Sequence, residues 1–217
     1  MKREEALAVA KPILFNTEMV MAIQNATKTV TRRVIKPRFR ENECEFFTAT
    51  IAGQLFLCYS DEDDEETRRI KAPYQVGDIL YVRETWTTGC IVGNSKSYYV
   101  SQGERSYVIF KEDCQRNHIS IYDVVWKPSI HMPKWAARIF LQVTDVRVER
   151  LQDITDEDMV RDFALCPEAV NAVGKDVLVK TVWNSTVKKS DLDKYGWAAN
   201  PGVVVIEFEK VEMTENG

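Results

Sequence analysis

Several patterns that would identify common classes of protein are missing from the 217-residue sequence. It has only two histidines, and its five cysteines are widely spaced and never form a C-x-x-C pair, so a zinc site would have to draw on scattered residues. An odd number of unpaired cysteines is typical of reduced thiols in the cytosol. The sequence therefore predicts a cytoplasmic protein without a structural metal or a cofactor.

Signatures of membrane proteins and of common hydrolases are missing as well. No apolar run approaches the roughly 20 residues that span a bilayer, and the charged N-terminus lacks the apolar stretch of a signal peptide. There is no glycine-rich phosphate loop, which argues against kinases and NTPases. Ser129 and His131 are neighbours, but no G-x-S-x-G elbow accompanies them, so a serine hydrolase is not expected. We expect a soluble protein with no membrane partner.

The balance of charge excludes a protein that coats nucleic acid over its whole surface. The formal net charge is −4, whereas such a protein needs a dominant basic field. A hydrophobic fraction of 45% and a charged fraction of 29% are ordinary for a globular domain. The acid excess is concentrated at positions 60–66, "SDEDDEE", which we interpret as a solvated loop because adjacent carboxylates repel one another.

One short window has the opposite charge. No carboxylate occurs between Glu18 and Glu41, and the segment carries six cations: Lys28, Arg32, Arg33, Lys36, Arg38 and Arg40. Repulsion among such neighbours is relieved by solvent or by an anionic partner. The window is therefore either a solvated strand edge, kept basic against aggregation, or a binding site.

Local patterns predict short helices among many strands. Asn16 and Thr17 are suitable N-caps for a short helix, and "KTVTRRVI" has the β-branched alternation of a strand that ends at Pro37. Two strands are expected around Ala52 and Gly53, one after Gly77, one in "SYVIFKED" and one in "GVVVIEFEKVE". Thr155 is expected to cap a helix, and "TVWNSTV" is compatible with another.

The longest strand pattern lies in "AARIFLQVTDVRVERL" and changes parity after Val143, which predicts a bulge or a sharp bend of the kind barrels use. Strands joined by short helices favour an α+β fold built on a small mixed β-barrel. We expect a single domain over residues 1–217, with insertions at about 41–72, 88–122 and 164–190.

The run Ala26-x-Lys28-x-x-Thr31-x-Arg33 resembles the G-x-K-x-x-E-x-R signature of the ASCH domain family, a small barrel related to the PUA domains of RNA-modifying proteins. The blocks "YQVGDILYVRETW", "WKPSIHMPKWAARIFLQVTDVRVERLQDIT" and "YGWAANPGVVVIEF" are similar to ASCH-like proteins of phages and prophages. Ala26 stands where the family has glycine, and Thr31 where it has glutamate. The resemblance implies a PUA-like barrel.

A bacterial subgroup of similar barrels, the N4-acetylcytidine amidohydrolases, has K-T-x-T-x-R at this place. The resemblance implies that Lys28 and Thr31 are catalytic, with Thr31 attacking an acyl carbon and Lys28 as its base. The acid that protonates the leaving amine would be Asp162, one methylene shorter than the glutamate of the subgroup, or Glu84.

Further residues are candidates for binding RNA, a nucleoside or a modified base. They are basic or aromatic and lie in the matching blocks: Arg32, Arg33, Lys36, Arg83, Trp86, Trp126, His131 and Trp135. For at least one of Trp126 and Trp135 a rigid loop that plugs the barrel is the alternative. Besides an amidohydrolase, the chain is compatible with a non-catalytic binding module, an ASCH-type ribonuclease or a phage protein that counters a host defence.

Overall fold

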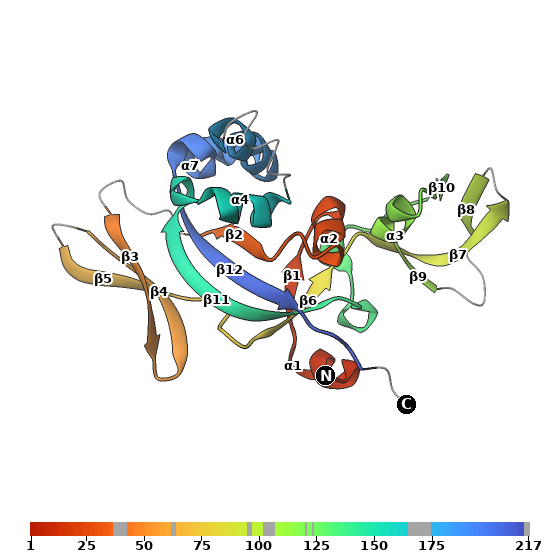
Figure 1. Cartoon of the computed structure of the whole chain (residues 1–217), viewed down its shortest axis with the longest axis horizontal. Helices are drawn as coiled ribbons and strands as arrows, with labels where there is room; N and C mark the ends of the chain where they lie inside the picture. Colours follow the sequence, from red (N-terminus) through yellow and green to blue (C-terminus); the bar gives the residue numbers. More distant parts are fainter. Residues whose placement is uncertain are drawn as a thin grey trace. The chain divides into compact units, whose positions relative to one another are not determined.

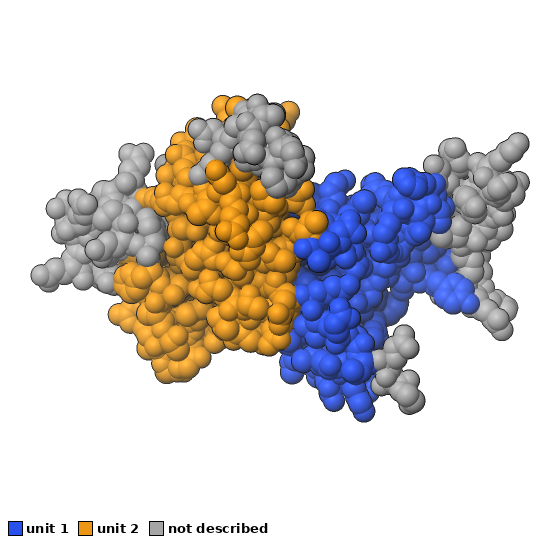
Figure 2. All heavy atoms as spheres, viewed as in Figure 1, with its two compact units in different colours: residues 1–26, 79–141, 210–217 blue, residues 27–78, 142–209 orange. Residues whose placement is uncertain are grey.

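The chain combines short helices with groups of consecutive strands, which confirms the predicted α+β class (Figure 1). The computed structural model describes residues 1–36, 43–61, 64–94, 97–101, 107–119, 121–122, 124–164 and 175–214. They divide into two compact units (Figure 2). Unit 1 comprises residues 1–26, 79–141 and 210–217, and unit 2 comprises residues 27–78 and 142–209.

Unit 1 contains two groups of paired strands. Its elements are α1 (Arg3–Val9), β1 (Lys11–Leu14), α2 (Thr17–Gln24), β6 (Ile79–Arg83), β7 (Trp86–Asn94), β8 (Ser97–Ser101), β9 (Tyr107–Phe110), α3 (Lys111–Arg116), β10 (Ile121–Tyr122), η1 (Ser129–His131) and η2 (Lys134–Ala136). β1 pairs with β6 in parallel, and a second sheet has the order β10-β8-β7-β9. As predicted, Asn16 caps α2, because its side chain accepts a hydrogen bond from Met19 N at 2.8 Å.

Unit 2 contains a hairpin sheet and a curved sheet covered by helices. Its elements are β2 (Val30–Val34), β3 (Glu43–Ile51), β4 (Gln54–Asp61), β5 (Asp64–Lys71), most of β11 (Phe140–Arg150), η3 (Leu151–Asp153), α4 (Asp156–Phe163), α6 (Lys175–Thr186), η4 (Lys189–Asp191), α7 (Leu192–Tyr195), η5 (Trp197–Ala199) and β12 (Gly202–Lys210). The hairpin sheet has the order β3-β4-β5, and β12 lies between β11 and the edge strand β2. Figure 1 shows β11 as a strongly curved strand.

The helices of unit 2 pack against one face of β2 and β12. Val30 on β2 and Val203 and Val205 on β12 are fully buried in a cluster with Met159 of α4 and Trp183 of α6. Because side chains alternate along a strand, this register places residues 30, 32 and 34 on the helix side and residues 31 and 33 on the other side. The two faces of β2 therefore have different surroundings.

Two local predictions need correction. Every described residue of the acidic run 60–66 is in a strand and not in a loop, because Ser60 and Asp61 end β4 and Asp64 begins β5; positions 62 and 63 lie outside the described residues. The pairing of β4 with β5 continues into the run, where Asp61 is the backbone partner of Asp64. In "SYVIFKED" the strand ends at Phe110, and Lys111 begins α3, whose first turn places Glu112 and Asp113 near the positive helix end.

Ala26 adopts a backbone conformation that favours glycine, the residue that the ASCH signature has at this position. Its φ is 57°, in the left-handed region, whereas Asn25 has a φ of −84°. A Cβ in this region costs about 1–2 kcal/mol, partly offset by the smaller entropy that alanine loses on folding.

We expect Ala26→Gly to raise the free energy of unfolding by about 0.5–1 kcal/mol in urea titrations. Ala8→Gly, at an exposed helical position of α1, is the control and should lower it by a similar amount; a loss for both variants would contradict the prediction.

Candidate functional site

The segment between α2 and β2 brings Lys28 to the carboxylate of Asp162 on α4. Lys28 Nζ donates to Asp162 Oδ1 and to Val30 O, each at 2.7 Å, and also to the backbone carbonyl of Asp162. Both side chains are almost completely buried. Lys28 lies before β2 and not within the strand, so its direction does not follow strand alternation.

Burial changes the acidity of Lys28. Desolvation lowers the pKa of the ammonium below its ordinary value of 10.5, while the negative charge and the hydrogen bond of Asp162 oppose this change. The charges of Arg33 and Arg32 lower it further. Loss of hydration is the largest of these effects. A lowered pKa is what a lysine needs to act as a base.

Arg32 lies beside this pair at the centre of three carboxylates. Its guanidinium contacts Glu149 at 2.7 Å, Asp158 at 2.8 Å and Asp162 at 3.2 Å, and its side chain has no exposed surface. Burial alone would lower the pKa of Arg32, but Asp162 and Glu149 raise it above its ordinary value. Arg32 is therefore an internal cation that joins β2 to α4 and β11, not a surface contact for phosphate.

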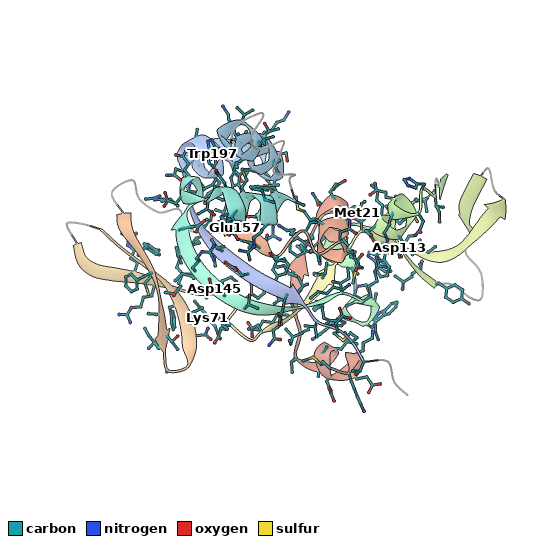
Figure 3. The ribbon with its side chains drawn as sticks, in the orientation of Figure 1. Met21, Lys71, Asp113, Asp145, Glu157 and Trp197 are labelled. Atoms are coloured by element: carbon teal, nitrogen blue, oxygen red, sulfur yellow. The ribbon has the colours of Figure 1, made fainter. Side chains whose placement is uncertain are left out.

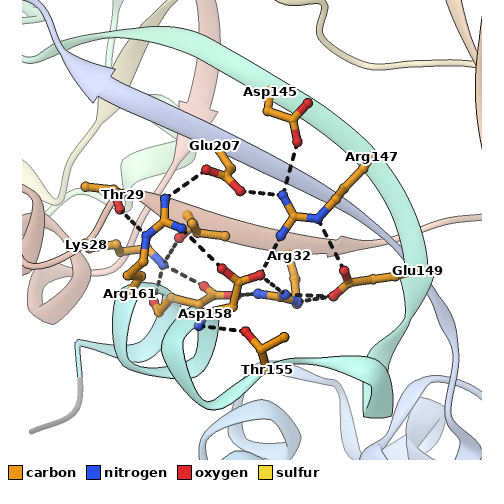
Figure 4. A network of polar contacts seen from close by, with 12 residues as sticks. Lys28, Thr29, Arg32, Asp145, Arg147, Glu149, Thr155, Asp158, Arg161 and Glu207 are labelled. Carbon is orange, nitrogen blue, oxygen red and sulfur yellow. Dashed lines mark hydrogen bonds and ion pairs between the residues drawn. The ribbon is translucent and has the colours of Figure 1, made fainter. Parts of the chain in front are cut away.

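A more exposed ring of charges surrounds this centre (Figure 4). Arg147 on β11 contacts Asp145, Glu149, Asp158 and Glu207. Arg161 on α4 contacts Asp158 at 3.3 Å and Glu207 at 2.8 Å, and donates to Thr29 Oγ1 at 3.0 Å. We call the whole set the β2–α4 network; it combines the cations Lys28, Arg32, Arg147 and Arg161 with the acids Asp145, Glu149, Asp158, Asp162 and Glu207.

The other predicted residues of the basic window lie in different surroundings. Thr31 is 3% exposed and pairs with Ile206 of β12 on the face opposite Arg32. Arg33 shares that face and is exposed to solvent. Lys36 is exposed, with Nζ 5.3 Å from the ring centroid of Tyr195. Arg38 and Arg40 lie outside the described residues.

Glu84, the alternative acid, belongs to a separate cluster in unit 1. Its carboxylate is 1% exposed and forms two hydrogen bonds with Arg138, at 2.8 and 2.9 Å. Arg138 also contacts Glu112 at 3.1 Å and Asp113 at 2.7 Å; Asp113 is labelled in Figure 3. Of the two acids, Asp162 is the one that contacts Lys28, whereas Glu84 forms its ion pair with Arg138.

Glu84 gives unit 1 a pH-dependent contribution to stability. Burial raises the pKa of Glu84 above 4.5, although Arg138 opposes the shift. The folded state therefore binds this proton more tightly than the unfolded state does, and the stabilisation is lost as the pH rises from 4.5 through the raised pKa. We expect the stability of the wild type, relative to Glu84→Gln, to fall as the pH rises above 4.5 in urea titrations. A difference that rises with pH would contradict this sign.

Five predicted binding residues lie in or beside a loop of unit 1. Arg83 donates to the backbone carbonyls of Met132, at 3.1 Å, and Ile130, so it braces the loop. Trp86 is only 6% exposed and packs in the core of unit 1, which leaves little of its ring for a ligand. In the loop, Trp126 is half-buried, His131 is exposed and Trp135 is 60% exposed. Trp135 therefore presents more than half of its surface to solvent.

Sequence reasoning missed most of the charged partners. Asp145, Arg147 and Glu149 alternate along β11, and this period-two pattern of opposite charges could have indicated one charged strand face. Arg138 gave no such signal, because its partners come from β6–β7 and α3, far away in the sequence. In the described ranges no group of three His, Cys, Asp or Glu side chains is arranged to hold a metal ion.

The helices described here include none that is long and apolar enough to cross a membrane.

Comparison with known proteins identifies no relative. No family model matches the sequence, and neither the curated proteins nor the solved structures include a significant match.

Proposed function

We propose that this protein is a PUA-like, ASCH-type protein of nucleoside or RNA metabolism, and that its β2–α4 site hydrolyses the acyl amide of an N4-acylated cytidine. The observation that carries the proposal is the position of the Lys28 ammonium, 2.7 Å from both Asp162 Oδ1 and Val30 O. The Val30 carbonyl belongs to the peptide that joins Val30 to Thr31. The ammonium therefore connects the threonine backbone with the carboxylate.

In the proposed reaction Thr31 Oγ1 attacks the acyl carbon from the face of β2 opposite Arg32, and its proton passes through a water molecule to the neutral amine of Lys28. The lowered pKa of Lys28 supports this role, because it increases the neutral fraction. A proton from the Lys28–Asp162 pair then moves to the N4 nitrogen as the carbon–nitrogen bond breaks, so cytidine leaves and an ester of Thr31 remains. Water hydrolyses the ester, which releases the carboxylic acid and restores the hydroxyl.

The test is incubation of the purified protein with N4-acetylcytidine, followed by chromatographic separation of the nucleosides. We expect cytidine and acetate to form in equal amounts and in proportion to the protein concentration. If the substrate is recovered unchanged under conditions in which the protein is folded by circular dichroism, the amidohydrolase proposal is wrong.

A second candidate is a binding module without turnover. The contacts of Lys28 favour it. A protonated lysine has three N–H donors, and Val30 and Asp162 together accept three hydrogen bonds, so these contacts suit a lysine that stays protonated and does not act as a base. Arg33 and Lys36, by contrast, are exposed. In this case RNA binds with an affinity that falls steeply with salt, and Lys36→Ala lowers the salt slope by about one. Binding without cytidine release would select this candidate.

A further inference from the structure

We propose that unit 1 carries a second contact surface, for single-stranded nucleic acid, on the loop from Trp126 to Trp135. In this arrangement an unpaired base stacks on Trp135, and Lys127 and Lys134 contact neighbouring phosphates. The inference rests on unit 1 alone and does not require that the β2–α4 site be catalytic. It is carried by the exposure, the rigidity and the charge of the loop.

The loop exposes apolar and aromatic side chains that a monomeric surface usually covers. Trp135 is 60% exposed and Ile130 is 56% exposed, and Val125, which precedes the loop, is 83% exposed. An indole ring with this accessibility can stack on a base, and such stacking contributes about 1–3 kcal/mol per base. Trp86, Trp183 and Trp197, by contrast, are each at most 8% exposed.

The backbone of the loop is held from both sides. Trp86 and Lys127 exchange two backbone hydrogen bonds, at 2.8 and 3.2 Å. Arg3 Nη2 donates to the carbonyls of Trp135 at 2.6 Å and Ala137 at 3.0 Å. Met132 is completely buried, and its Sδ lies 3.1 Å from the backbone nitrogen of Glu84. A surface held in this way loses little conformational entropy when a ligand binds.

The charge of the loop selects an anionic partner. No aspartate or glutamate occurs between Asp123 and Asp145, whereas Lys127, Lys134 and His131 lie within that range. Both lysines are held over aromatic rings. Lys127 Nζ lies 4.6 Å from the centroid of Trp86, and Lys134 Nζ lies 5.6 Å from that of Tyr81.

Fixed cations beside an exposed indole favour a strand that offers both phosphates and unpaired bases. A duplex hides the faces of its bases, so a single strand fits this surface better.

The experiment measures fluorescence anisotropy of labelled oligo-U and oligo-dT of about 12 nucleotides, titrated with the full chain at about 50 mM and about 200 mM salt. We expect Trp135→Ala to weaken binding of the single strands about tenfold or more, and Lys134→Ala to lower the salt slope by about one. Tyr107→Ala is the matched control, because Tyr107 is another exposed aromatic of unit 1, at 63%. It should change the affinity less than twofold.

Three results would overturn the proposal: no binding of either oligonucleotide at low salt, equal binding by wild type and Trp135→Ala, or an equal loss for Tyr107→Ala. Equal binding would leave the exposed indole to a protein partner. Binding is measured without a nucleoside substrate. Failure here is therefore distinct from failure of the amidohydrolase proposal, which the release of cytidine tests separately.

Discussion

Replacing Arg32 by methionine is expected to lower the free energy of unfolding by about 3 kcal/mol. The guanidinium has no exposed surface and contacts Glu149, Asp158 and Asp162. Methionine fills much of the same volume but leaves three carboxylates without their shared cation. Each retains another cation: Lys28 contacts Asp162, Arg147 contacts Glu149, and both Arg147 and Arg161 contact Asp158. We therefore expect the loss to stay at the lower end of the range for buried pairs.

Urea titration measures this effect, with Lys36→Met as the matched control. Lys36 belongs to the same basic window, but it is exposed and has one weak contact, with the ring of Tyr195. Its replacement should change stability by less than about 1 kcal/mol. Equal effects of the two substitutions would show that the window is a solvated strand edge and that the β2–α4 network does not hold unit 2 together.

Replacing Thr31 by valine is expected to reduce the hydrolysis of N4-acetylcytidine by about 10³-fold or more, with little change in the thermal midpoint. Valine removes the proposed nucleophile and keeps the β-branched shape that suits β2. The rate of cytidine release measures the change. This substitution is more informative than Lys28→Met, which also breaks a buried ion pair and therefore lowers stability.

Thr29→Val is the control for the chemistry of this change. It removes a hydroxyl from the same segment, where Thr29 Oγ1 accepts a hydrogen bond from Arg161 at 3.0 Å, but it leaves Thr31 intact. We expect its turnover to stay within about threefold of the wild type, since one partly exposed hydrogen bond contributes only about 1 kcal/mol. Wild-type turnover in Thr31→Val would exclude a threonine nucleophile.

Local chemistry in the sequence was enough to predict most elements of the fold. Asn16 and Thr155 cap helices as expected, because a side-chain oxygen followed by free backbone N–H groups is a local feature. The alternation in "KTVTRRVI" predicted β2, and the turn at Ala52 and Gly53 joins β3 to β4. The acidic run failed because pairing between β4 and β5 depends on residues outside the run.

The sequence by itself determined that a basic window spans a short strand. The resemblance then selected Lys28 from the window and Asp162 from a distant part of the chain. The sequence could not separate Arg32, which is buried, from Arg33, which is exposed, because composition does not say which face of β2 meets α4. Only the tertiary structure decided that Asp162 contacts Lys28 and that Glu84 contacts Arg138. The physical reason is that a buried charge requires a partner, and folding brings that partner from a distant part of the chain.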